Sequence, residues 1–288
     1  MDNSGERSGL IYEKKIKFYI NFKKMKVALY LPGMLRQFEL PYKYLKKYVL
    51  EPLNPDIFFS GYPNDDGIKI CHKKIRELYS PKKYILREFD DEIKKIIYPN
   101  GIEKYYSNKR SETKPLNYIS GRYNIKICNE LRKNYEQENN VKYDVIICSR
   151  TDIFYDREYS QDEILKSKNG EILIPHGWDF KEVHPSAVSD IGIITNPDNM
   201  DVYASLYDFI DVYYNEGITF HPETYVGIHL ERTGLNNKRT SINNWENISE
   251  TIDWWDWKYN PPPKSCTSWW GWYSFEHPKL GLKYERKR

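Results

Sequence analysis

Residues 149–152 place a guanidinium and a carboxylate, Arg150 and Asp152, directly after a short apolar run at 145–148. An arginine can hold phosphate oxygens through two parallel N–H donors. An aspartate can hold a divalent cation that bridges the same oxygens. The pair therefore suits a diphosphate group, with Asp152 as the predicted metal ligand. The alternative is an ion pair between the two side chains that closes the end of a strand.

Four more residues are candidates for binding or catalysis. Gly33 and Arg36 follow the first predicted strand, where the phosphate or base of a nucleotide could rest; the alternative is a turn glycine and a surface arginine. Asp190 lies in an apolar pattern, where a carboxylate is costly to bury unless it is paired or ligated. It is expected at a sheet edge in contact with substrate, or as the cap of a turn. Glu223, behind Pro222, either complements a helix dipole or serves as a general base.

Other polar positions give weaker signals. Asp65 and Asp66 fall in a loop-like stretch and are expected in a solvated turn. Asp156 continues the spacing of Arg150 and Asp152, but it can also pair with a neighbouring arginine. His229 is expected in the core. The four cysteines are widely spaced and include no metal-binding pair, which indicates a reducing compartment: Cys71, Cys128, Cys148 and Cys266.

The elements that position these residues alternate between strand and helix patterns. Such alternation favours an α/β fold with a mostly parallel central sheet flanked by helices. The longest helix is expected to bury Tyr123, Ile127, Leu131 and Tyr135, which keep a spacing of four. Strands are predicted at 26–31, 56–60, 83–89, 145–148 and 188–195, and helices at 40–50, 68–79, 90–97, 116–138, 200–214 and 223–233.

The chain of 288 residues is divided into three predicted parts. Residues 1–24 form a polar, lysine-rich leader without the apolar segment of a secretory signal. Residues 25–235 form a catalytic domain. Residues 236–288 form a Trp-rich extension packed on that domain. Its tryptophans cover one side of the sheet or, at one or two positions, stack on sugar rings.

Composition narrows the function classes. The net charge is only +3 on 44 basic and 41 acidic residues, which does not indicate a nucleic-acid partner. A mean hydropathy of −0.78 suits a soluble protein, and no stretch reaches the length of a membrane span.

The order of several segments resembles nucleotide-sugar-dependent glycosyltransferases with the GT-A, Rossmann-like fold, of the bacterial and giant-virus polysaccharide class. The matching segments cover most of residues 26–235 and read KVALYLPGMLRQFE, PDIFFSGY, YDVIICSRTDIFYD, VSDIGIITNPDNMDVYASL and FHPETYVGIHLERTGL. The resemblance implies a nucleotide sugar across the strand ends, with a D-x-D carboxylate on the cation of its diphosphate. Here Arg150-Thr151-Asp152 stands at that place, so an arginine replaces the first acid.

The activity implied by this resemblance is transfer of a sugar from a nucleoside diphosphate donor to a hydroxyl of a glycan or protein-glycan acceptor, in the cytoplasm of the producing or host cell. Gly33, Arg36, Arg150 and Asp152 would bind the nucleotide sugar, with Mn²⁺ or Mg²⁺ on Asp152. An inverting enzyme would use Glu223 or Asp190 as its base, whereas a retaining enzyme needs no such base.

Two other functions stay open at this point. A non-catalytic carbohydrate-binding protein would use the tryptophans and need no metal carboxylate. A metal-dependent phosphohydrolase would use Asp152 together with further acids on neighbouring strand ends.

Overall fold

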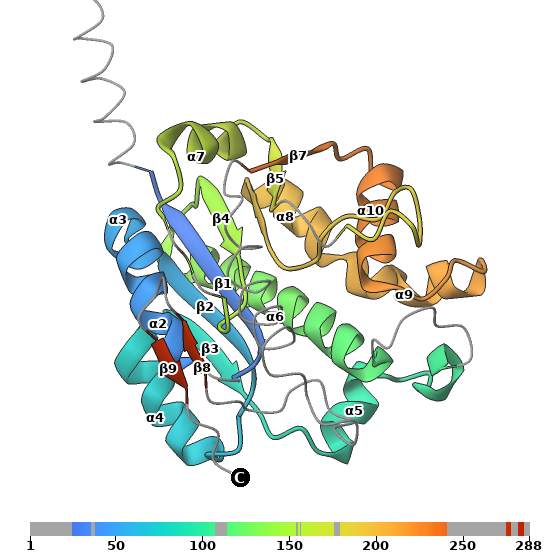
Figure 1. The fold of residues 1–288 in the computed structure, drawn as a ribbon, viewed down its shortest axis with the longest axis horizontal. Helices are drawn as coiled ribbons and strands as arrows, with labels where there is room; N and C mark the ends of the chain where they lie inside the picture. The colour runs from blue at the N-terminus through green and yellow to red at the C-terminus, as the bar shows by residue number, and fades with distance from the viewer. Residues whose placement is uncertain are drawn as a thin grey trace, which may run out of the picture.

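A seven-stranded sheet between two layers of helices organises the chain (Figure 1). The computed structural model describes residues 25–35, 38–106, 114–153, 155, 157–175 and 179–240, and the backbone of 275–277 and 282–284. The predicted leader, Arg36, Asp156 and all eight tryptophans lie outside the described residues.

The sheet has the strand order β3-β2-β1-β4-β6-β5-β7. All strands except β6 run in one direction, because β6 pairs antiparallel with both β4 and β5. The predicted α/β class with a mostly parallel, helix-flanked sheet is therefore confirmed. The strands are β1 (Val27–Met34), β2 (Asp56–Tyr62), β3 (Lys83–Leu86), β4 (Val145–Cys148), β5 (Ile172–Ile174), β6 (Ile193–Thr195) and β7 (Asn237–Arg239), with a separate antiparallel pair of β8 (Phe275–His277) and β9 (Leu282–Tyr284).

Helices cover both faces of the sheet, as Figure 1 shows for α4 on one side and α6 on the other. One face packs on α2 (Glu39–Leu45), the π-helix η1 (Lys46–Leu50), α3 (Glu51–Leu53), α4 (Ile68–Tyr79) and α7 (Gln161–Lys168). The other packs on α5 (Asp91–Ile97), the 3₁₀ helix η2 (Glu103–Tyr106), α6 (Pro115–Asn139), α8 (Pro197–Ala204), α9 (Leu206–Asn215) and α10 (Pro222–Arg232). In the described part of the chain, no helix is both long and apolar enough to cross a bilayer.

Alternating strand side chains supply the two cores. In β1, Leu29 and Leu31 belong to one core, whereas Ala28 and Tyr30 belong to the other. Burial on both faces explains why the strands read as continuous apolar runs rather than as an alternating pattern.

The turn predicted at Gly33 is wrong, because β1 continues through Gly33 to Met34. Gly33 pairs with Gly61 of β2 and has a φ of +103°, which favours glycine. A Cβ added at Gly61 would lie 1.7 Å from the Gly33 carbonyl oxygen. The two glycines therefore let β1 and β2 stay paired to their carboxyl ends.

Two other predicted elements differ in the structure. The strand predicted at 188–195 begins only at Ile193, so Asp190 lies in the preceding loop. The helix predicted at 200–214 is divided at Ser205, whose hydroxyl donates to the Val202 carbonyl at 2.7 Å. Beyond the predicted domain limit at 235, β7 pairs with β5 and extends the sheet.

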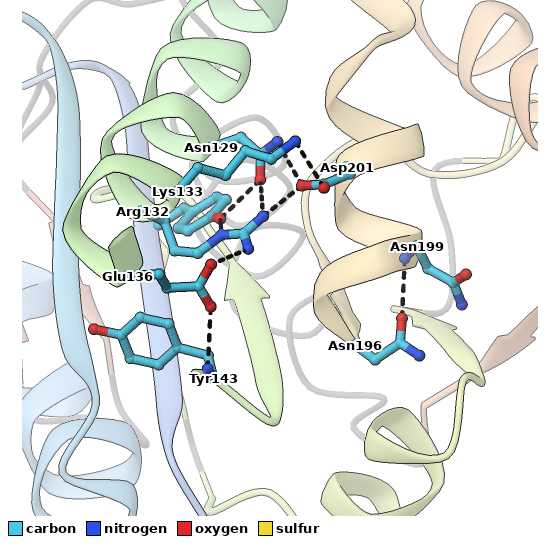
Figure 2. Close-up of polar contacts among 9 residues, drawn as sticks. Asn129, Arg132, Lys133, Glu136, Tyr143, Asn196, Asn199 and Asp201 are labelled. Atoms are coloured by element: carbon cyan, nitrogen blue, oxygen red, sulfur yellow. Dashed lines mark hydrogen bonds and ion pairs between the residues drawn. The ribbon is translucent and has the colours of Figure 1, made fainter. Parts of the chain in front are cut away.

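The buried face of α6 is turned away from the predicted one and carries polar residues (Figure 2). Arg132 donates to Tyr30 on β1 at 3.0 Å and to Glu136 at 2.7 Å, and it also contacts Asp201 on α8. Asn129 bonds to Tyr30 and Asp201. This network joins α6 and α8 to the sheet.

Candidate functional site

The segments that carry Arg150 and Asp190 reach the edge of the sheet where the parallel strands end. Cys148, the last residue of β4, pairs with Ile193, the first residue of antiparallel β6. Arg150 after β4 and Asp190 before β6 therefore come to the same edge. Because β5 and β7 run parallel to β4, the residues that follow them also reach this edge.

Arg150 and Asp152 form a two-bond ion pair at the end of β4. Arg150 Nε donates to Asp152 Oδ1 at 2.8 Å, and Nη2 donates to Oδ2 at 2.6 Å. The chain turns at residues 151–152, so the extended spacing considered for Arg150, Asp152 and Asp156 does not continue. The ion pair that was the alternative interpretation is present. The Arg150 side chain is 38% exposed and the Asp152 side chain 16%, so the arginine is the more accessible partner.

A divalent cation on a diphosphate needs one or two carboxylates beside the phosphate oxygens, and to bind Asp152 it would have to displace Arg150. Both Asp152 oxygens accept from Arg150. Across the described ranges between 25 and 240, no group of three His, Cys, Asp or Glu side chains is placed to hold a metal ion. Arg150 is therefore the described side chain that we expect to neutralise the charge of a bound diphosphate.

Asp190 forms an ion pair with the buried guanidinium of Arg122. Arg122 of α6 is 3% exposed; its Nη2 donates to Asp190 Oδ2 at 3.1 Å, and its Nη1 donates to the Tyr203 hydroxyl at 2.7 Å. The guanidinium also lies over the rings of Tyr118 and Tyr203. The Asp190 side chain is 26% exposed, so one carboxylate is both anchored and open to solvent.

Glu223 lies beside Asp190 in a more buried position. Burial raises the pKa of Glu223 to about 9, and the negative charge of Asp190 adds to the effect. Burial also lowers the pKa of His221, whose Nδ1 is 3.2 Å from Glu223 Oε2. These two atoms lie within ion-pair range but are not aligned as a hydrogen bond. We favour a neutral pair, because burial shifts both groups toward their uncharged forms.

The loop that carries Asp190 is fixed against α10. Val188 N donates to the Glu223 carbonyl at 3.0 Å. A Cβ added at Gly227 of α10 would lie 1.7 Å from the Ser186 carbonyl oxygen, so the glycine permits direct backbone contact. Asp179 accepts a hydrogen bond from Ser189 N at 3.0 Å. It also forms an ion pair with Arg239, the last residue of β7. These contacts bring Asp190 and Glu223 together.

Of the remaining predicted residues, those that the structure describes do not belong to this site. Gly33 lies in paired strand, and Arg36 lies outside the described residues. Asp66 is exposed and bonds Lys74 at 2.9 Å, as a solvated turn requires. His229 is a buried core histidine, as predicted, with the Tyr213 hydroxyl and the Val202 carbonyl each at 2.8 Å. Burial raises the pKa of Cys148 to about 12, so this thiol is not a nucleophile at neutral pH.

Sequence reasoning missed Arg122 as part of the site. The signal was a stripe along α6 with spacings of three and four that contains both apolar and polar residues. The members of this buried stripe are Tyr118, Arg122, Ile125, Asn129, Arg132 and Glu136. Asp179, which lies in a loop, and Arg239, the last residue of β7, had no local signal.

A cavity of about 690 Å³ lies at the opposite edge of the sheet. Its lining includes Val27 at the start of β1 and Asn54 just before β2. None of the candidate residues lines this cavity, so the cavity is not part of the candidate site.

Comparisons with known proteins give a distant structural likeness. No protein family model matches the chain, and no curated protein matches it. Among solved structures, mouse xyloside xylosyltransferase 1 in its apo form is similar, with a TM-score of 0.41 and 11% sequence identity over 81% of this chain and 93% of that one. A likeness this distant assigns neither a donor nor an acceptor to this chain.

Proposed function

We propose that the protein transfers a sugar from a nucleoside diphosphate donor to an acceptor hydroxyl. The observation that carries the proposal is that the strand pairing brings Arg150 to the same carboxyl-end edge of the sheet as the neighbouring acids Asp190 and Glu223. Ligands of open α/β sheets bind at this edge. A cation for the leaving group and a pair of acids for the acceptor are the groups that such a transfer needs.

Arg150 is the proposed donor-side residue. Its guanidinium is the accessible cation at the end of β4, and two of its nitrogens already hold Asp152. The two hydrogen bonds to Asp152 fix the orientation of the guanidinium, so little reorganisation would be needed when a diphosphate binds. An oriented charge of this kind stabilises the negative charge that develops on a departing diphosphate.

Asp190 is the proposed base on the acceptor side. The acceptor oxygen attacks the anomeric carbon while its proton moves to the Asp190 carboxylate. The bond from that carbon to the diphosphate oxygen breaks, and the nucleoside diphosphate leaves with the electron pair. Glu223 holds a proton at neutral pH because its pKa is raised to about 9, so it serves as a hydrogen-bond donor beside the base. Attack of this kind inverts the anomeric centre.

The donor side can be tested by titrating the protein with a panel of nucleoside diphosphates and nucleotide sugars, with and without Mn²⁺. We expect one nucleoside diphosphate to bind and raise the melting temperature, and Arg150→Ala to weaken that binding at least tenfold. Arg76→Ala, at an exposed position on α4, is the matched control and should bind as the wild type does.

Other outcomes would contradict the proposal. Stabilisation by an oligosaccharide and by no nucleotide would indicate a carbohydrate-binding protein. Phosphate release from nucleotides without a sugar acceptor would indicate a phosphohydrolase.

A further inference from the structure

We infer that Arg122 is the positioning residue of the site: from beneath the sheet edge it fixes the direction and charge of the Asp190 carboxylate. The inference rests on the proposed function, in which Asp190 is the base. Arg122 itself is 3% exposed and therefore acts through Asp190 rather than on a substrate.

The geometry supports an anchoring role over a simple surface ion pair. Arg122 divides its donors, with Nη1 on the Tyr203 hydroxyl at 2.7 Å and Nη2 on Asp190 Oδ2 at 3.1 Å. Tyr203 belongs to α8 and Arg122 to α6, so two helices fix the guanidinium before Asp190 meets it. The rings of Tyr118 and Tyr203 beside the guanidinium further restrict its rotation.

The hydrogen bond from Arg122 uses one oxygen of the Asp190 carboxylate and leaves the other to accept a proton. Within the described residues, Arg122 is the hydrogen-bond partner that the structure gives the Asp190 side chain, and the bond uses Oδ2. The carboxylate keeps 26% of its side-chain surface exposed. A base with one oxygen anchored and the other facing solvent has a defined direction for accepting a proton.

Other titratable groups lie close to the Asp190 carboxylate and its two neighbours on α10. Glu223 and His221 lie at the start of α10, and the loop adds Asp179 and Glu182 near these two residues. Tyr118 and Tyr203 are the other titratable neighbours. Arg122 is the cation bonded to Asp190, so it stabilises the negative charge of this carboxylate.

The test compares Arg122→Met, Arg122→Lys and Lys126→Met in sugar transfer. Lys126, one turn further on α6, forms a partly exposed ion pair with Asp208 and serves as the control. Arg122→Met should lower kcat at least tenfold and leave the donor KM within about twofold, because the base loses its direction while the donor contacts stay in place. Arg122→Lys should recover part of kcat, whereas Lys126→Met should match the wild type.

A second measurement does not depend on activity. Hydrogen–deuterium exchange of the amides at 187–192 should accelerate in Arg122→Met and stay unchanged in Lys126→Met. An unchanged kcat together with unchanged exchange would overturn the inference. If the wild type transfers no sugar from any donor, the proposed function fails, and the exchange data alone still decide whether Arg122 positions Asp190.

Discussion

At the scale of single residues, Asp190 and Glu223 are neighbouring acids in different environments. Asp190 is partly exposed and paired with Arg122, whereas Glu223 is buried and its pKa is raised to about 9. Acids whose surroundings separate their protonation states can take different roles in one reaction. The sequence predicted both residues as candidates but gave no reason to prefer Asp190, because the cation beneath it lies 68 positions away in the chain.

Asp190→Asn should remove the base while leaving the donor contact at Arg150 in place. We expect kcat to fall about 10²- to 10⁴-fold with little change in nucleotide affinity. Steady-state kinetics and calorimetry would measure the two effects separately. Asp66→Asn, at an exposed turn, is the control. Equal loss of binding and turnover in Asp190→Asn would contradict its assignment as the base.

Glu223 should make stability depend on pH. The unfolded chain releases this proton near the ordinary pKa of 4.5, whereas the folded chain holds it up to about 9. The stabilisation is therefore complete below pH 4.5 and is lost as the pH rises toward about 9. Glu223→Gln stays neutral, so its melting temperature should decline less over that range than that of the wild type or of Glu77→Gln, an exposed control. Parallel curves for all three proteins would show that Glu223 is not held protonated.

At the scale of elements, close contact between α10 and the 184–189 loop sets the position of Asp190. Gly227→Ala would place a methyl group 1.7 Å from the Ser186 carbonyl oxygen. We expect it to destabilise the fold by ~1–3 kcal/mol and to reduce turnover. Gly121→Ala, where no atom lies within 4 Å of the new Cβ, should stabilise α6 by ~0.5–1 kcal/mol. Urea denaturation of both variants tests this, and equal stabilities would contradict the contact.

The buried polar residues of α6 also act at the scale of elements. Arg132 and Glu136 are 4% and 6% exposed, so Arg132→Met would leave a buried carboxylate without its cation. We expect a loss of ~3–5 kcal/mol in the free energy of unfolding. Lys133→Ala removes a more exposed pair with Asp201 and should cost under ~1 kcal/mol. A double variant, Arg132→Met with Glu136→Met, should recover much of the loss; failure to recover would mean that packing rather than charge sets the cost.

Over the whole molecule, the sequence predicted those helices and strands whose bounds are set by residues close together in the chain. The bounds of α4 at 68–79 and β4 at 145–148 were predicted residue for residue, because periodicity and flanking turns mark them. β6 was predicted too long, because the apolar residues at 187–188 are buried in the loop beside α10 instead of being paired in the sheet. The face of α6 was misassigned because tertiary partners neutralise polar residues that its pattern marked as exposed. The function of the 236–288 extension stays a prediction.

The most direct test of the central claim is the transfer reaction itself, followed by NMR with the donor identified by binding and a panel of oligosaccharide acceptors. We predict one nucleoside diphosphate released for each glycosidic bond formed, with the anomeric configuration inverted, and neither event in Asp190→Asn. Retention of configuration would contradict Asp190 as the base. A nucleotide sugar that stays intact with every acceptor, or that does not bind, would contradict the assignment of this sheet edge as a transferase site.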